Sequence, residues 1–171
     1  MAEIRLCRDD EREAMLALVN AAAEAYRGVI PADRWHEPYM PRQELEREIA
    51  AGVVFFLLEE DSGVAGVMGI QDKADVALVR HAYVAPHVQR KGVGRRLLRH
   101  LESLTDKPVL IGTWAAASWA IDFYVRNGFT VVSLADKERL LRKYWSIPDR
   151  QIETSVVLAD RRWVARRGGD L

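Results

Sequence analysis

The chain contains one basic stretch that is interrupted by glycines, His87-Val88-Gln89-Arg90-Lys91-Gly92-Val93-Gly94-Arg95-Arg96-Leu97-Leu98. Its second half predicts a helix, since Val93, Leu97 and Leu101 recur every four residues and form one apolar face. Gly92 and Gly94 have no Cβ, so the backbone there can bring its amides close to a ligand. The amides at a helix start lack internal partners, and the helix dipole adds partial positive charge. The stretch therefore predicts an anion-binding loop that suits phosphate.

Four cations surround these glycines: Arg90, Lys91, Arg95 and Arg96. The helix dipole disfavours each cation at this end by roughly 0.3–1 kcal/mol, and a bound anion would remove that cost. A solvated basic helix face is the alternative interpretation. The two glycines favour the anion site.

The surroundings of the loop exclude two common phosphate sites. A β-rich segment, residues 76–84, precedes the loop and ends at Pro86, and a second one, residues 109–113, follows the helix. A P-loop would need a Gly-Lys-Ser/Thr ending, which the chain lacks. A dinucleotide fingerprint would need a small residue where Leu97 stands, and a carboxylate after residues 109–113. Neither nucleotide site fits.

Two motifs together resemble the GNAT N-acetyltransferase superfamily. The first is Gln89-x-x-Gly92-x-Gly94, between a strand and a helix, and the second is Ala120-x-x-Phe123-Tyr124-x-x-x-Gly128-Phe129 further along the chain. The resemblance implies a single-domain α/β fold with a mixed central sheet flanked by helices. It also implies that the central strands splay apart at the cofactor site.

The resemblance further implies acetyl-CoA as the acyl donor, without a metal. The pyrophosphate would lie on the amides of residues 90–95, pantetheine would run alongside Tyr83 and Val84, and the Val84 amide would polarise the acetyl carbonyl. The implied cofactor-binding residues are Tyr83, Val84, Gln89, Arg90, Lys91, Gly92, Val93, Gly94 and Arg95. Tyr124 would protonate the departing thiolate, because a tyrosine with a pKa of about 10 is neutral near pH 7. Alternatively, Tyr124 is a core aromatic on a stripe that it shares with Trp119 and Phe123.

Part of the chemistry stays open at this point. His36, Glu37 and His81 have the right chemical type for a general base, but the sequence places none of them. The family commonly has asparagine where Ala117 stands, although Ser118 could substitute. We therefore expect an N-acetyltransferase that moves an acetyl group directly from CoA to an amine, and keep a non-catalytic acyl-CoA sensor or docking domain as the alternative.

Length and composition limit the number of domains, the partners and the cellular location that we expect. The 171 residues suit one domain, residues 1–171, in which residues 161–171 are expected to form a frayed basic tail. Its 25 basic and 25 acidic residues cancel, so no nucleic-acid partner is expected. A single cysteine, Cys7, and the lack of a signal or membrane segment predict a cytoplasmic protein with no membrane partner. The four histidines show no metal-ligand spacing. The acceptor, a small amine or a protein amino group, and a homodimer are left open.

The remaining elements alternate. Predicted strands cover residues 4–7, 53–58, 64–70, 129–134 and 152–158, and predicted helices cover residues 11–25, 41–51 and 115–127. The run 53–58 is expected to be buried on both faces. The loop 26–40 carries Trp35, His36, Tyr39 and Met40, which line an acceptor pocket or clamp the loop to the body. The insert 135–151 would cover the active site or pack on the sheet edge.

Overall fold

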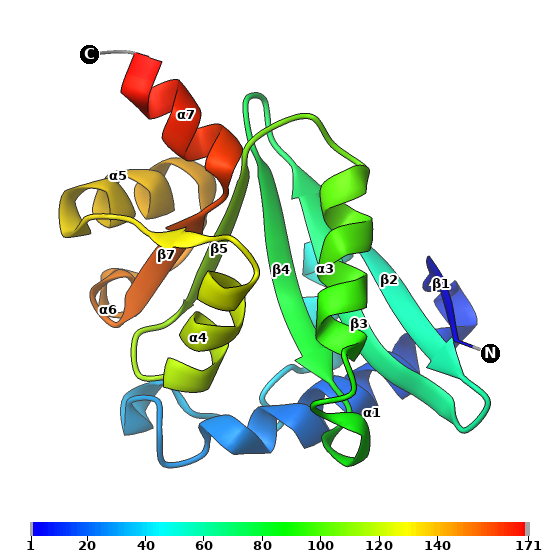
Figure 1. The fold of residues 1–171 in the computed structure, drawn as a ribbon. Coiled ribbons are helices and arrows are strands. Elements are labelled where there is room, and N and C mark those ends of the chain that lie inside the picture. Colours follow the sequence, from blue (N-terminus) through cyan, green and yellow to red (C-terminus); the bar gives the residue numbers. More distant parts are fainter. Residues whose placement is uncertain (1, 170–171) are drawn as a thin grey trace. The chain divides into compact units, whose positions relative to one another are not determined.

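The computed structural model describes residues 2–169 and contains a seven-stranded mixed sheet in the order β1-β2-β3-β4-β5-β7-β6 (Figure 1). The strands are β1 (Glu3–Leu6), β2 (Val53–Glu60), β3 (Gly63–Asp72), β4 (Ala77–Val84), β5 (Val109–Trp114), β6 (Thr130–Val131) and β7 (Ser155–Ala159). The pairs β1–β2, β2–β3, β5–β7 and β6–β7 are antiparallel. The predicted α/β fold with a mixed sheet is confirmed.

Helices occupy most of the sequence between these strands. The α-helices are α1 (Arg12–Ala22), α2 (Arg42–Ala50), α3 (Val93–Ser103), α4 (Ser118–Arg126), α5 (Leu134–Tyr144), α6 (Asp149–Glu153) and α7 (Arg161–Gly169). Short 3₁₀ helices are η1 (Asp9–Glu11), η2 (Ala23–Tyr26), η3 (Ala32–Arg34) and η4 (Pro86–Val88). In the described part of the chain no helix has the length and apolar character needed to cross a membrane.

The chain forms two compact parts. The first part comprises residues 2–27, 35–72 and 79–106, and the second comprises residues 28–34, 73–78 and 107–169. In the first part, helix α3 lies along β2 and β3 (Figure 1). Its buried face consists of Val93, Leu97, Leu98 and Leu101. Each such side chain contributes roughly 1.5–3 kcal/mol by leaving water.

Gly66 in β3 permits the close approach of α3. A Cβ added there would lie 2.7 Å from Val93 Cγ1 and 3.0 Å from Leu97 Cδ1, which is too close for ordinary contact. Packing of α3 on this strand holds the first turn of the helix, and therefore the preceding loop, in place. The absence of a side chain at Gly66 thus lets α3 pack closely on β3, and this packing holds the loop in position.

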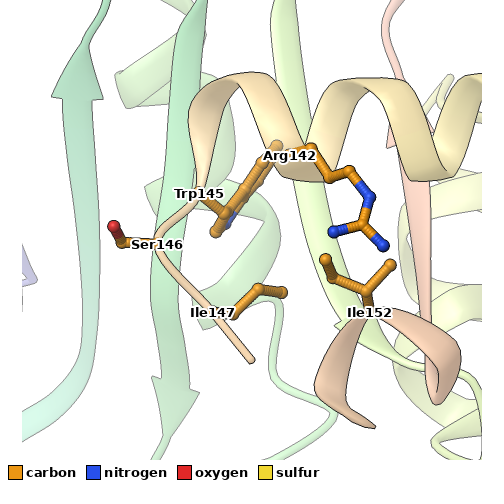
Figure 2. Close-up of a pocket in the computed structure, with 5 residues that line it drawn as sticks. All are labelled: Arg142, Trp145, Ser146, Ile147 and Ile152. Atoms are coloured by element: carbon orange, nitrogen blue, oxygen red, sulfur yellow. The ribbon is translucent and has the colours of Figure 1, made fainter. Parts of the chain in front are cut away.

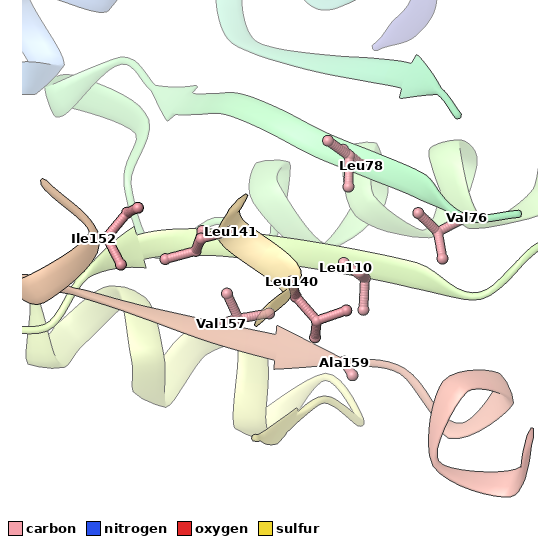
Figure 3. Close-up of a cluster of buried hydrophobic side chains, with 8 residues drawn as sticks. All are labelled: Val76, Leu78, Leu110, Leu140, Leu141, Ile152, Val157 and Ala159. Atoms are coloured by element: carbon pink, nitrogen blue, oxygen red, sulfur yellow. The ribbon is translucent and has the colours of Figure 1, made fainter. Parts of the chain in front are cut away.

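The second part has its own apolar core, shown in Figure 3. Its buried members are Val76, Leu78, Leu110, Leu140, Leu141, Ile152, Val157 and Ala159. Val76 lies directly before β4, and the others come from strands β4, β5 and β7 and from helices α5 and α6. Trp145 packs against them. A Cβ at Gly112 of β5 would lie 3.3 Å from the Trp145 ring, so the glycine leaves room for the indole to pack against the strand.

Several local predictions were wrong. The predicted strand 129–134 is reduced to β6, because Ser133 caps α5 by accepting a hydrogen bond from the Asp136 amide, so the chain turns helical at Leu134. The insert 135–151 holds most of α5 and the start of α6, and α5 packs on β7. The expected frayed tail is helical over Arg161–Gly169, and residues 170–171 lie outside the described residues.

Two burial predictions also need correction. Val54 is 44% exposed, so β2 alternates between inside and outside at its start and is not buried on both faces there. Trp119 of α4 is 43% exposed and does not belong to a fully buried stripe. In both cases the apolar character of the segment led us to expect more burial than the structure shows. Apolar side chains also cover much of a protein's surface.

Candidate functional site: an anion-binding loop at the start of helix α3

The loop after β4 is anchored to the first part by backbone hydrogen bonds and by buried side chains. The Ala85 amide donates a hydrogen bond to the Ala65 carbonyl at 2.8 Å, and the Val88 amide donates to the Ala85 carbonyl at 3.0 Å. The side chains of Val88 and Val93 are buried on either side of the exposed residues between them. The loop is therefore held at its ends, and residues 89–92 face solvent.

The backbone of this loop takes two left-handed conformations. Arg90 has φ 70° and Gly92 has φ 79°, with Lys91 between them. A non-glycine residue with positive φ costs on the order of 1–3 kcal/mol and is found most often at functional sites. Turns of this kind orient successive amides into a concave site for anions. A Cβ at Gly92 would meet nothing within 4 Å, so the conformation, and not space, calls for glycine there.

Helix α3 begins at this point without a side-chain cap. Gly92 is its N-cap residue, and its first backbone hydrogen bond joins the Arg96 amide to the Gly92 carbonyl at 3.1 Å. The preceding amides of the first turn are left for an external acceptor. Phosphate oxygens suit such a set of donors, and phosphate binding by this loop stays a prediction.

The cations of the loop reinforce the same site. Arg90, Lys91 and Arg95 are exposed, and among residues 2–169 none of them forms an ion pair. By contrast, Arg99 of the same helix is paired with Glu102 at 2.8 Å. Unpaired positive charge at the positive end of a helix dipole fits the phosphates of CoA.

The strand end beside the loop carries the other predicted cofactor residues. Gln89 Nε2 donates to the Val84 carbonyl at 3.4 Å, so this side chain folds back onto the end of β4. The Tyr83 ring makes an edge contact with the Tyr26 ring, with ring centroids 6.4 Å apart. The centroids of the Tyr26 and Tyr39 rings are 5.5 Å apart. Burial, together with a hydrogen bond to Tyr39, raises the pKa of Tyr83 well above its usual value. Tyr83 is therefore a neutral wall of an aromatic cluster.

Residues 35–40 of the predicted acceptor loop belong to this cluster. The rings of Trp35 and Tyr39 stack at 5.6 Å, and the Arg27 guanidinium lies 4.8 Å from the Trp35 ring centre. Met40 is buried, and its backbone exchanges two hydrogen bonds with the Asn20 side chain. Met40 thus clamps the loop, whereas the role of the exposed His36 in acceptor binding stays a prediction.

Tyr124 lies in α4 of the second part. Its side chain is 6% exposed, and its ring makes edge contacts with Phe123 at 5.1 Å and with Phe129 at 6.1 Å. Burial raises the pKa of the phenol, which stays protonated at neutral pH. Ala117, where the family has asparagine, is buried at the start of α4, and Ser118 is exposed. The role of Tyr124 as an acid stays a prediction.

The second part also has a hollow of about 350 Å³, which Figure 2 shows. It is lined by Arg142, Trp145, Ser146, Ile147 and Ile152. Arg142 is occupied by ion pairs with Glu138 and Asp149. No residue of the two motifs lines this hollow, so we do not assign it to the reaction. Among the described residues no group of three or more histidine, cysteine or acidic side chains could hold a metal.

Sequence reasoning missed two residues that surround a candidate base. Glu48 Oε2 of α2 lies 2.8 Å from Arg80 Nη1 and 3.2 Å from His81 Nε2, with all three side chains largely buried. Burial alone would raise the pKa of Glu48, but His81, Arg80 and Arg47 lower it. His81 itself has φ 56° within β4. Glu48 is far from His81 in sequence, and no motif links them.

Comparison with known proteins agrees with this geometry. A family model described as an acetyltransferase (GNAT) domain matches residues 51–131, which include the loop and the whole second motif. No match is found among curated proteins. The fold is similar to that of PaiA N-acetyltransferase from Thermoplasma acidophilum in complex with coenzyme A, with a TM-score of 0.71 and 19% identity over 94% of this chain and 98% of that one.

Two further solved structures share the fold. An acetyltransferase of the GNAT family from Staphylococcus aureus Mu50 has a TM-score of 0.69 and 15% identity, covering 94% of this chain and 98% of its own. The ribosomal-protein-S18-alanine N-acetyltransferase from Escherichia coli has a TM-score of 0.63 and 19% identity, covering 94% and 93%.

The fold is shared with solved acetyltransferases, one of them in complex with coenzyme A. A model of the GNAT acetyltransferase domain matches residues 51–131, in agreement with the predicted resemblance. The loop at the start of α3 fits the phosphates of the cofactor. Members of this family acetylate amines on small molecules and on proteins.

Proposed function

We propose that this protein moves an acetyl group directly from acetyl-CoA to an amine acceptor. The observation that carries the proposal is the uncapped start of α3 beside a loop with positive φ at both Arg90 and Gly92. This arrangement binds a diphosphate through backbone amides, while Arg90, Lys91 and Arg95 supply charge. Gly94 and Val93 belong to the same first helical turn.

Acetyl-CoA supplies an acetyl group that is already activated as a thioester. In the proposal, the Val84 amide holds the acetyl carbonyl oxygen, and Tyr83 and Gln89 shape the passage beside it. The Tyr124 hydroxyl gives its proton to the sulfur of CoA as the acetyl group leaves. Support for Tyr124 comes from its match to the second motif and from its protonated state. Positioning and polarity then provide most of the rate.

The acceptor is an amine on a small molecule or on a protein. We place the reaction in the cytoplasm, since the chain has the single cysteine Cys7, and keep the homodimer as part of the proposal to be measured. The aromatic cluster of Tyr26, Trp35, Tyr39 and Tyr83 is the surface we assign to the acceptor.

Two measurements test the proposal. Acetyl-CoA at about 100 times its dissociation constant should stabilise the fold by about 2.7 kcal/mol, visible as a rise in melting temperature, and NAD should do much less. A screen across amine classes, read by release of the CoA thiol, should then find acceptors. Equal shifts with NAD would reject the loop assignment. Binding without turnover on any amine would support an acyl-CoA sensor instead.

A further inference from the structure

The first part contains a buried charged cluster that the anion loop does not use. Glu48 Oε2 lies 2.8 Å from Arg80 Nη1 and 3.2 Å from His81 Nε2, and the three side chains are only 17%, 18% and 14% exposed. Arg80 also contacts Gln71 Oε1 at 3.3 Å, and Gln71 donates to the Ala51 carbonyl at 3.0 Å. Arg80 alone can neutralise Glu48, so charge balance does not require His81.

The contact between His81 and Glu48 is enclosed. Neither His81 Nε2 nor Glu48 Oε2 is open to solvent, and neither makes a well-aligned hydrogen bond in the described part of the chain. Phe55 covers the imidazole, with ring centres 5.9 Å apart. Enclosed polar groups of this kind are costly unless another function retains them.

The backbone at His81 gives a second, independent observation. Its φ of 56° is unusual inside a strand, and conformations of this kind cluster at functional sites. Tyr83, two residues further along β4, joins the aromatic cluster assigned to the acceptor, and Val84 follows it. The His81–Glu48 pair therefore lies on the strand that leads to the proposed acetyl contact.

We propose that His81 is the general base of the transfer and that Glu48 positions it. This inference rests on the function proposed above. A carboxylate only accepts hydrogen bonds, so the proton of neutral His81 lies on Nε2 toward Glu48, and Nδ1 keeps the lone pair. A carboxylate that orients a histidine base is a familiar arrangement in acyl transfer.

The nitrogen lone pair of the neutral amine forms a bond to the acetyl carbonyl carbon, and the bond between that carbon and sulfur breaks. His81 Nδ1 takes one N–H proton from the amine, while the thiolate receives the Tyr124 proton. His81 then releases its proton, and Tyr124 regains one, through solvent. The products are the acetylated amine and the free CoA thiol.

Other charged groups surround the pair and contribute to its pH dependence. Helix α2 supplies Glu44, Arg47 and Glu48, and β4 supplies Arg80 and Tyr83. Phe55 of β2 adds an apolar wall. Only Glu48 contacts the imidazole nitrogen as an ion-pair partner among the described residues. Glu48 is therefore the residue whose substitution tests the positioning of His81.

The test uses His81→Asn, because asparagine tolerates positive φ and can still donate to Glu48. With an acceptor from the screen, we expect kcat to fall by roughly 10²–10⁴ at pH 8, while the melting shift with acetyl-CoA stays unchanged. The difference from wild type should shrink as the pH falls, because a general base acts only in its neutral form. His100→Asn, on α3 against Phe56, is the matched control and should keep its activity.

Glu48→Gln provides a second measurement if His81→Asn does not fold. Loss of the carboxylate should change the acid limb of the kcat/KM profile, because Glu48 is the charged group in contact with the His81 imidazole. A wild-type rate in His81→Asn, or a loss that is equal at every pH, would overturn the role of His81. An unmoved acid limb in Glu48→Gln would overturn the positioning role. Inactivity of the wild-type protein toward all amines would instead reject the proposed function.

Discussion

Arg90 in the anion loop and His81 in β4 are the two non-glycine residues with positive φ among residues 2–169, and they differ in what surrounds them. Arg90 is exposed, and its neighbours offer backbone amides to solvent. His81 is largely buried, and its side chain meets Glu48. The same departure from ordinary backbone thus presents amides in one region and fixes a side chain in the other. One region is suited to binding and the other to chemistry.

If binding and chemistry are separate, chemistry can be removed alone. Tyr124→Phe keeps the aromatic volume in α4 and removes one hydroxyl. We expect kcat to fall by roughly 10²–10⁴, the usual range for a general acid, with acetyl-CoA affinity unchanged. The rate should be measured from pH 6 to 9, so that a shifted optimum is not mistaken for lost chemistry. Wild-type kcat across that range would refute the acid role and leave the loop assignment standing.

Binding should likewise be removable through the loop. Gly94→Val places a branched side chain in the first turn of α3, where the backbone is proposed to meet pyrophosphate. Losing two hydrogen bonds to a charged group, at about 1.5 kcal/mol each, should weaken acetyl-CoA binding about 100-fold. Titration calorimetry measures this, with circular dichroism as the control for folding. A folded variant of unchanged affinity would place the anion elsewhere.

The left-handed conformation at Gly92 can be tested by stability. Gly92→Val should lower the free energy of unfolding by about 1–2 kcal/mol, because φ 79° is strained for a branched residue although no atom blocks its Cβ. Gly92→Asn should cost less, since asparagine tolerates this region. Denaturant unfolding of the two variants provides the comparison. Equal stability of both would mean that the loop relaxes to another conformation.

The ion pair of Arg5 and Glu11 has no proposed role in catalysis, in contrast to the pair of His81 and Glu48. Arg5 forms a bidentate pair with Glu11, at 2.7 and 2.6 Å, and also bonds Glu59. The hydrogen bond from Arg5 lowers the pKa of Glu11 from 4.5 to about 2. A lowered pKa in the folded state stabilises the protein above pH 4.5, and this stability is lost as the pH falls through about 2.

Glu11→Gln should therefore lower the free energy of unfolding at pH 7 by about 1–2 kcal/mol, a value reduced for solvent screening. The wild type should lose that advantage between pH 4.5 and pH 2, whereas the variant should change less. Acetyl-CoA turnover per folded molecule should stay at the wild-type level. A fall in turnover with full folding would mean that this pair also serves the reaction.

Some of these regions were predictable from the sequence and others were not. The anion loop was predictable because glycines, cations and an amphipathic helix are neighbours in the chain, and each has a local physical meaning. The boundaries of β6 and α5 were not predictable. Residues 129–134 are β-rich, but Ser133 among them accepts a hydrogen bond from the Asp136 amide and so caps the start of a helix. The splayed strands expected at the cofactor site remain a prediction.

The sequence by itself determined the class of fold and the glycine loop that opens a helix, since these depend on contacts between near neighbours. Only the tertiary structure decided that Glu48 of α2 meets His81 of β4, across 33 positions of sequence that no periodicity connects. It also decided that residues 161–169 form a helix, where Arg162 reaches the Lys107 carbonyl, 55 positions away in sequence. Long-range partners supply these hydrogen bonds and charges, and a linear pattern carries no record of them.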